Sequence, residues 1–262
     1  MKRIKHNDLV PWFTQDHGTL PASYLRSCEK FFKSLKLQAK SRKLQASSFK
    51  LDKERIKDYI GYMLKKELQK IVGGLSKPSK MPGPAYNIPA AACITGSKLV
   101  NVKGSVCEGC YALKGRYRFP NVKEALNGRL KALQHPGWVD AMIQLIKPHK
   151  EFRWHDSGDL QSLDHLKNIF KVCEGTPDTS HWIPTREAQI LKQVKPEEVP
   201  KNLIIRFSSH MINQGPVSFW PWTSTVKTDG QHSCPADQQN NECRDCRACW
   251  NRDIKNISYG KH

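Results

Sequence analysis

The segment EFRWHDSGDLQSLDHLKNIFKVC, residues 151–173, decides the fold class. It begins with a short, mainly apolar stretch at residues 151–154, which predicts a buried strand. A polar loop follows, and apolar residues then recur with helical spacing from Ser162, the expected N-cap, to Cys173. A strand, a polar loop and a helix in this order form the repeating unit of a parallel sheet.

The same order of features repeats twice downstream. A strand expected at residues 181–183 ends in Pro-Thr-Arg-Glu and precedes a helix at about 187–194. A further strand, expected at residues 203–207, ends in Ser-Ser-His. Upstream, a long helical stretch at residues 122–147 is interrupted near Pro136-Gly137. We therefore expect an α/β protein with a parallel (β/α) partial or full barrel.

Three parts are expected along the 262 residues. Residues 1–80 hold 19 Lys and Arg against 7 Asp and Glu, and residues 56–72 show helical periodicity, so this part is expected to be a basic helical module. Residues 77–89 are rich in Pro and Gly and predict a linker. Residues 81–230 form the barrel-like catalytic domain in this division, and residues 231–262 form a metal-binding segment with four cysteines.

The formal net charge of the chain is +19. A solvated, solubilising surface would account for some of this charge, but a nucleic-acid partner is favoured because phosphates attract an excess this uneven. No run approaches the roughly 20 apolar residues of a membrane span, so no membrane partner is expected. The N-terminus lacks the apolar segment of a signal peptide. We expect a cytoplasmic, reducing location, where clustered cysteines favour metal over disulfides.

The first cysteine group consists of Cys93, Cys107 and Cys110. The last two form a CxxC turn, whose two-residue gap lets both thiolates converge on one ion or cluster. Three cysteines with no obvious fourth ligand suit a [4Fe–4S] cluster with one open iron, or a zinc ion completed by histidine or water. Buried structural thiols are the plainer alternative.

The second group places four cysteines within 16 residues: Cys234, Cys243, Cys246 and Cys249. Four thiolates form a complete tetrahedral set for structural Zn²⁺ or for a [4Fe–4S] cluster. The CxxCxxC spacing is more common for iron–sulfur, whereas zinc sites usually separate two CxxC pairs. The sequence leaves both metals open.

Polar residues follow each of the three expected strands. The first loop contains an imidazole, two carboxylates, a hydroxyl and a glycine, in the order His155, Asp156, Ser157, Gly158 and Asp159. Asp156 or Asp159 would bind an amino group or move a proton. Gly158 would allow a ligand to approach the backbone closely.

Because the carboxyl ends of parallel strands meet at one edge, where such folds build active sites, we expect these clusters to form a single site. Each cluster alone would also suit a loop cap or a surface ion pair. The candidate catalytic residues are His155, Asp156, Asp159, Arg186 and Glu187. The candidate cofactor-binding residues are Ser157, Gly158, Arg206 and Ser208.

Four stretches together resemble the phage gene-product-88 family. They are CEGCYALKGRY (107–117), RWHDSGDL (153–160), WIPTRE (182–187) and CRDCRACW (243–250). The resemblance covers residues 80–262 and implies a phage-encoded or bacterial protein. By itself it implies no particular reaction.

The cysteine loop ending in Cys-x-x-Cys-Tyr-Ala, followed by Asp-rich and Thr-Arg-rich strand ends, looks like the radical-SAM (S-adenosylmethionine) partial barrels. In that family three cysteines of a CxxxCxxC motif bind a [4Fe–4S] cluster, and the fourth iron chelates SAM. The resemblance implies that Cys93, Cys107 and Cys110 are the ligands and that Gly158-Asp159 faces the methionyl amino group. In this chain, thirteen residues separate the first two cysteines.

The chain is also similar to tRNA-guanine transglycosylases and their DNA-modifying relatives. Those barrels carry an Asp-Ser-Gly-Gly-Phe-Gln loop, a Pro-Thr-Arg loop and a cysteine-rich zinc site. Residues 156–161 and 184–186 echo the two loops, and Ser180 stands where the nucleophilic aspartate is expected. This resemblance implies base exchange, with Asp156 or Asp159 as the acid–base or covalent residue.

The leading hypothesis is an iron–sulfur enzyme that modifies a base in DNA or RNA by radical-SAM-like chemistry. In this hypothesis the cofactors are one or two [4Fe–4S] clusters, with S-adenosylmethionine as a candidate cosubstrate. The first alternative is a zinc-containing DNA or RNA base transglycosylase. The second is a non-catalytic nucleic-acid-binding protein whose fold is stabilised by metal.

Overall fold

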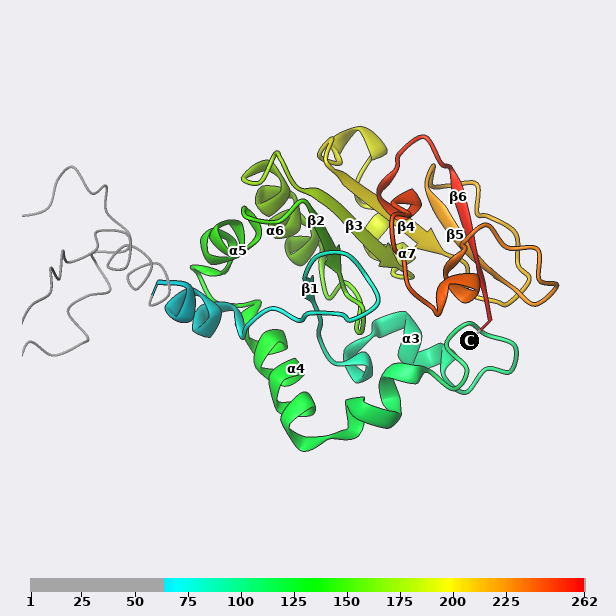
Figure 1. Cartoon of the computed structure of the whole chain (residues 1–262), viewed down its shortest axis with the longest axis horizontal. Helices are drawn as coiled ribbons and strands as arrows, with labels where there is room; N and C mark the ends of the chain where they lie inside the picture. Colours follow the sequence, from blue (N-terminus) through cyan, green and yellow to red (C-terminus); the bar gives the residue numbers. More distant parts are fainter. Residues whose placement is uncertain (1–63, 262) are drawn as a thin grey trace, which may run out of the picture. The chain divides into compact units, whose positions relative to one another are not determined.

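Residues 64–261 are described in a computed structural model of the chain (Figure 1). Residues 1–63, which include most of the expected basic helical module, lie outside the described residues, as does His262. The described residues contain a six-stranded parallel sheet in which each strand pairs with the next along the chain. The strands are β1 (Ala85–Tyr86), β2 (Glu151–Trp154), β3 (Ser180–Thr185), β4 (Leu203–Ser208), β5 (Thr223–Lys227) and β6 (Asn256–Gly260).

Helices and irregular segments connect these strands. The α-helices are α3 (Ile94–Leu99), α4 (Pro120–Ala132), α5 (Trp138–Ile146), α6 (Leu163–Glu174) and α7 (Ala188–Leu191), and a further helix occupies residues 64–72. Short 3₁₀ helices are η4 (Ala90–Ala92), η5 (Tyr111–Leu113), η6 (Gly115–Arg118), η7 (Pro196–Glu198), η8 (Ala236–Gln239) and η9 (Ala248–Trp250). The predicted α/β class and parallel sheet are confirmed. Parallel strands that pair in their order along the chain also form the wall of a (β/α) barrel. The described strands, however, form an open sheet, because β1 and β6 do not pair with each other.

Several expected elements appear where the sequence places them. The strand at 151–154 is β2, and the break near Pro136-Gly137 separates α4 from α5. Ser162 caps α6, because its side chain accepts a hydrogen bond from His165 N. The sequence predicted these elements correctly because each has a clear local pattern, such as a cap or a helix break, next to residues that are buried in the structure.

The linker expected at residues 77–89 is wrong in part, because β1 lies inside it. Ala85 and Tyr86 are completely buried and pair with Arg153 and Trp154 of β2. The Tyr86 hydroxyl donates hydrogen bonds to the carbonyl oxygens of Val72 (2.7 Å) and Arg129 (2.9 Å). A strand of two residues depends on these tertiary contacts, and the surrounding prolines and glycines conceal it in the sequence.

The described part of the expected basic module contacts the core of the sheet, since Val72 is completely buried there. At the other end, β6 is a strand of the same sheet. The cysteine-rich segment is therefore part of the α/β unit.

The two faces of the sheet differ in chemistry. Phe152 and Trp154 of β2 are buried on one face, where Trp154 packs against Trp138 of α5. Figure 1 shows α5 and α6 beside β1 and β2. On the opposite face Arg153 lies over the ring of Trp182, with its guanidinium carbon 4.6 Å from the ring centroid. No helix in residues 64–261 is long and apolar enough to cross a membrane.

Three buried histidines lie in the core beside the apolar face. Burial lowers the pKa of His165 to about 4 and that of His181 to about 3, and it holds the pKa of His155 well below its usual value. The folded state therefore binds fewer protons than the unfolded state below about pH 6.5. The stability that these neutral rings provide is present above that pH and is lost as the pH falls toward their folded-state pKa values.

We expect His165→Phe to reduce this acid sensitivity. Each buried histidine lowers the free energy of unfolding by about 2 kcal/mol between pH 7 and pH 5, so the variant should lose about 2 kcal/mol less than wild type over this range. Urea unfolding at both pH values measures the difference. His135→Phe is the control, because His135 is exposed. If wild type and His165→Phe lost the same free energy of unfolding between pH 7 and pH 5, His165 would not be a source of the acid sensitivity.

Candidate metal and catalytic site

The first cysteine group lies in the long connection between β1 and α4. Cys93 is the residue before α3, and Cys110 is the residue before η5. A methyl group placed on Gly96 would lie 3.6 Å from Cys93 Sγ and 3.7 Å from Cys107 Sγ. The two sulfurs therefore flank the same point, although they are far apart in sequence.

The three thiols are electrostatically coupled. The pKa of Cys93 is raised to about 12, mainly by burial and then by the charges of Asp159, Glu187, Cys110 and Cys107. Burial also raises the pKa of Cys107, which the Arg186 guanidinium opposes. The eight cysteines of the described residues are all free thiols. A bound cation is what would hold the three sulfurs as thiolates.

Glu187, at the end of β3, fastens the Cys93 side of this loop. Its buried carboxylate accepts hydrogen bonds from Ile94 N (3.0 Å), Thr95 N (2.9 Å) and the Thr95 hydroxyl (2.6 Å). These are the first two residues of α3, directly after Cys93. The carboxylate satisfies amide groups that have no partner within the helix, and it thereby fixes the position of Cys93.

Asp156, after β2, fastens the Cys110 side. Its carboxylate pairs with Arg153 Nη1 (2.9 Å) and accepts a hydrogen bond from the Tyr117 hydroxyl (2.9 Å). The Tyr111 hydroxyl donates to the Asp156 carbonyl oxygen. Burial, together with the Asp156 charge, raises the pKa of Tyr111 to about 12 and raises that of Tyr117 further, so both phenols remain donors. Asp156 is thus a positioning residue for the turn that follows Cys110.

The segment after β4 provides a third attachment. Val106 N donates to His210 O (2.9 Å), Ile212 N donates to Gly104 O (2.9 Å), and Ser105 forms a bridge with Met211. The cysteine loop is therefore held by residues that follow β2, β3 and β4. Figure 1 shows α3 at the edge of the sheet toward which the central strands point.

Asp159 joins the β2 and β3 loops and lies near the thiols. Its carboxylate accepts hydrogen bonds from the Thr185 hydroxyl (2.6 Å), Leu160 N (2.7 Å) and Arg186 N (2.9 Å). Burial raises its pKa to about 6, with a further contribution from Glu187, while the hydrogen bonds to Thr185 and Arg186 lower it. A carboxyl group that titrates near neutrality beside cysteines has the properties of a functional group.

Arg186 supplies positive charge beside the thiols. Its guanidinium lowers the pKa of Cys107, and its buried Nε has no hydrogen-bond partner among the described residues. Its backbone carbonyl lies 3.3 Å from His210 Nε2. A carboxylate or phosphate of a ligand would provide the partner that this guanidinium lacks.

The remaining residues of the β2 loop take part in core contacts. His155 adopts a positive φ of 61°, and its ring packs against Trp154 and His165 in the core. The Ser157 hydroxyl donates to Ile88 O (3.0 Å). A Cβ on Gly158 would lie 2.3 Å from Ile88 Cγ1, so the close approach that this glycine allows is made by the chain itself.

Arg206 and Ser208, expected near a cofactor, are buried in protein contacts. The Arg206 guanidinium is completely buried and donates to carbonyl oxygens of Cys249, Ile254, Ala248 and Asn251 at 2.8–3.0 Å. The Ser208 hydroxyl lies 2.9 Å from that of Ser224. Arg206 therefore organises the C-terminal cysteine segment, which explains its position better than ligand binding does.

The second cysteine group covers the face of the sheet that carries Arg153 and Trp182. Trp250 of η9 packs against Trp182 and donates to Phe152 O (3.1 Å). Burial raises the pKa values of Cys234, Cys243 and Cys249, and the charges of Cys234 and Cys246 contribute to these shifts. The Cys249 sulfur lies 3.2 Å from the Tyr259 hydroxyl.

The donor chemistry of both groups fits a metal. Within residues 64–261, no three Cys, His, Asp or Glu side chains are close enough together to hold a single ion as they stand. Thiolate donors suit a zinc ion and an iron–sulfur cluster alike.

Four residues that position the first group were not among the sequence candidates: Thr95, Tyr111, Tyr117 and Arg153. Tyr111 directly follows the CxxC turn, Tyr117 comes seven residues after Cys110, and Arg153 alternates with buried aromatic residues in β2. A charged residue between two buried aromatic residues of a strand indicates that the opposite face of the sheet is polar at that position.

Glu187→Ala is expected to release the start of α3. The variant leaves the Ile94 and Thr95 amides without their charged acceptor, which should cost about 2–3 kcal/mol in the free energy of unfolding. Hydrogen exchange at these amides should accelerate. Glu197→Ala is the matched control, because Glu197 is an exposed glutamate of η7. Unchanged exchange in Glu187→Ala would contradict the assigned role.

Comparisons with known proteins give one match. A family model described as Gene product 88 matches residues 62–252. The matched range includes β1 to β5 and all seven clustered cysteines. The chain matches no curated protein and no solved structure.

Proposed function

The chain belongs to the gene product 88 family, and from this premise we propose that it is an iron–sulfur enzyme that modifies nucleic acid. The observation that carries the proposal is the cysteine loop with its three thiols, held at the carboxyl ends of β2, β3 and β4. Enzymes with parallel sheets build their active sites at this edge. Asp159 and Arg186, which lie next to the thiols, have the charges needed to bind a polar ligand.

Cys93, Cys107 and Cys110 would hold a [4Fe–4S] cluster. A cluster with three thiolate ligands supplies a one-electron redox centre with one open iron. Glu187 and Asp156 keep the loop in place, and Asp159 holds a proton that it can exchange near pH 6. The second cysteine group would hold a structural or auxiliary centre.

S-adenosylmethionine suits the polar residues beside the thiols as a cosubstrate. Its amino group would face the Asp159 carboxylate, and its carboxylate would face the Arg186 guanidinium, whose Nε has no partner in the described part of the chain. The two groups have opposite charge and belong to adjacent loops. They therefore match the amino and carboxylate groups of an amino acid.

The charge of the chain supports nucleic acid as the substrate. The net charge is +19, and the largest excess lies in residues 1–80. Phosphate binding explains such an excess. Whether the chain acts on DNA or on RNA is decided by the experiment below.

Base exchange with structural zinc finds less support at Asp156. The Asp156 carboxylate is already taken by Arg153 and Tyr117, which leaves it poorly suited to covalent chemistry. The Asp159 carboxylate accepts three hydrogen bonds of its own and is no freer for that reaction. A purely binding role explains the charge and the clustered cysteines. It does not account for the buried carboxyl group of Asp159, whose pKa is raised to about 6.

The test uses the full-length protein, purified anaerobically and reduced, with S-adenosylmethionine and single- or double-stranded DNA or RNA. We expect mass spectrometry of the digested nucleic acid to show one mass-shifted nucleoside that requires S-adenosylmethionine. Asp159→Asn should abolish it, while Asp164→Asn, at an exposed aspartate of α6, should not. Incorporation of a labelled free base without S-adenosylmethionine would instead support base exchange. The absence of any modified nucleoside would contradict an enzymatic role on nucleic acid.

A further inference from the structure

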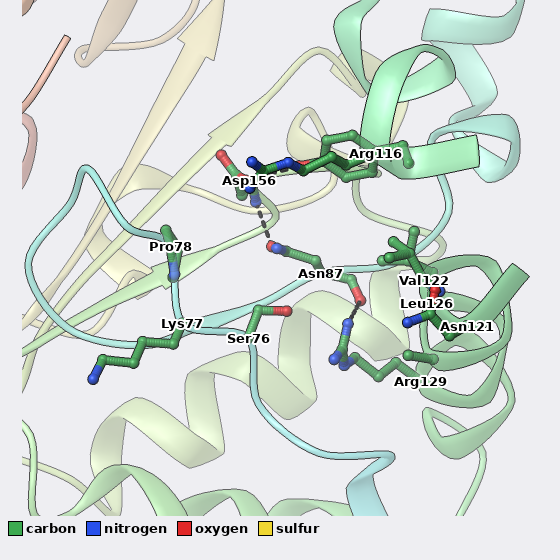
Figure 2. Close-up of a pocket in the computed structure, with 12 residues that line it drawn as sticks. Ser76, Lys77, Pro78, Asn87, Arg116, Asn121, Val122, Leu126, Arg129 and Asp156 are labelled. Atoms are coloured by element: carbon green, nitrogen blue, oxygen red, sulfur yellow. Dashed lines mark hydrogen bonds between the residues drawn. The ribbon is translucent and has the colours of Figure 1, made fainter. Parts of the chain in front are cut away.

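A cavity of about 460 Å³ lies beside the cysteine loop (Figure 2). It is bordered by the segment before β1, by Asn87 after β1, by η6 and by one face of α4. Tyr117 and Asp156 line it and also hold the turn after Cys110. The cavity and the candidate metal site therefore share two residues. Its volume is within the range of small-molecule sites.

The charge of this cavity is positive. Arg129 is 9 % exposed and donates to the carbonyl oxygens of Gly74 (3.0 Å) and Asn87 (3.4 Å), which carry no formal charge. Arg116 is exposed, and none of the ion pairs in the described residues involves Arg116 or Arg129. The lining carboxylate, Asp156, is already paired with Arg153. The guanidinium groups thus lack a negative partner.

Hydrogen-bond donors also border the cavity. The Asn87 side chain is 5 % exposed, and its Oδ1 accepts a hydrogen bond from Asp156 N (2.7 Å), as Figure 2 shows. Its NH₂ group has no partner among the described residues. The 13-residue helix α4 begins here with no acidic residue in its first turn. The helix dipole adds some positive potential at this end, although the Val122 amide is already bonded to Asn121 Oδ1 (2.9 Å).

Apolar atoms complete the lining. Val122, Ala125 and Leu126 of α4 and the ring of Tyr117 provide a surface for a planar group. Figure 2 shows Lys77 extending away from the other lining residues, so the two arginines carry the charge argument.

We propose that this cavity binds a phosphate-bearing nucleotide, with the phosphate at Arg116, additional positive charge from Arg129, and the base against α4 and Tyr117. The proposal rests on the proposed function, since it assigns the place where a nucleotide unit of the substrate would be held beside the cysteine loop. Enzymes that act on a base take the nucleotide out of its stack into such a pocket. The arginines provide the charge-assisted hydrogen bonds that phosphate requires.

The test measures binding of a 5′-mononucleotide and of its unphosphorylated nucleoside to the full-length protein by calorimetry. A mononucleotide avoids the broad electrostatic attraction of a long nucleic acid to a basic chain. We expect the nucleoside to bind at least about tenfold more weakly than the mononucleotide, and Arg116→Ala to weaken mononucleotide binding by about tenfold. Arg118→Ala is the matched control, because Arg118 is an exposed arginine of the same 3₁₀ helix that does not line the cavity, and it should change affinity less than about twofold.

A second variant tests the cavity without changing its charge. Ala125→Phe fills the space on the α4 side and should abolish mononucleotide binding while circular dichroism and the thermal midpoint show an intact fold. No binding to wild type, equal losses in Arg116→Ala and Arg118→Ala, or full binding by folded Ala125→Phe would overturn the proposal. Iron content, measured on the same samples, separates the two proposals. Mononucleotide binding by an iron-free, zinc-containing protein would keep the cavity and refute the iron–sulfur assignment.

Discussion

Cys107→Ser is expected to lose the [4Fe–4S] cluster that we propose for the first cysteine group and, with it, the proposed modification of nucleic acid. The serine hydroxyl is a poor replacement for a thiolate, and two cysteines cannot hold a [4Fe–4S] cluster that already lacks a fourth ligand. Anaerobically purified variant should contain about four fewer iron atoms per chain than wild type. Any metal held by the second cysteine group should be retained, because none of its cysteines has changed.

Glu108→Gln provides the control for this variant. Glu108 lies between Cys107 and Cys110, is exposed, and accepts a hydrogen bond from Gly104 N (2.8 Å) that glutamine also accepts. It should retain the iron content of wild type. If Cys107→Ser retained full iron, or if Glu108→Gln lost as much, the ligand assignment would be wrong.

Arg206→Met is expected to cause the largest loss of stability. Its guanidinium is completely buried and donates to the carbonyl oxygens that shape the segment around Cys249. Methionine fills part of the volume but leaves these acceptors unpaired, which should cost about 3–5 kcal/mol in the free energy of unfolding. Because the segment contains the second cysteine group, any metal that this group holds should be lost as well.

Urea unfolding and metal analysis measure both effects in one sample set. Lys201→Met is the control, since Lys201 is exposed and should change stability by less than about 0.5 kcal/mol. A change below about 1 kcal/mol in Arg206→Met, with the metal content of wild type, would show that the buried guanidinium does not organise the segment.

The sequence predicted those parts of the fold in which local pattern and burial agree. The strand at 151–154, the cap at Ser162 and the break near Pro136 have clear signals, and the structure contains all three features. The strands β1, β5 and β6 were not expected. The two residues of β1 have no pattern of their own, and Thr223–Lys227 and Asn256–Gly260 are polar strands whose position depends on pairing with the rest of the sheet.

The candidate site was predictable in location but not in detail. The rule that parallel strands end at one edge places the polar loops together. It cannot tell which side chains point toward the thiols. A positive φ directs His155 into the core, and a hydrogen-bond network turns Asp156 toward Arg153 and Tyr117. These orientations depend on backbone geometry and on residues distant in sequence.

The most direct test of the account measures iron, acid-labile sulfide and zinc in the full-length protein after anaerobic purification. If the first cysteine group holds a [4Fe–4S] cluster, we expect at least about four irons and four sulfides per chain, with broad absorption near about 400 nm. A colourless protein that contains only zinc, and that takes up no iron and sulfide under reducing conditions, would contradict the account.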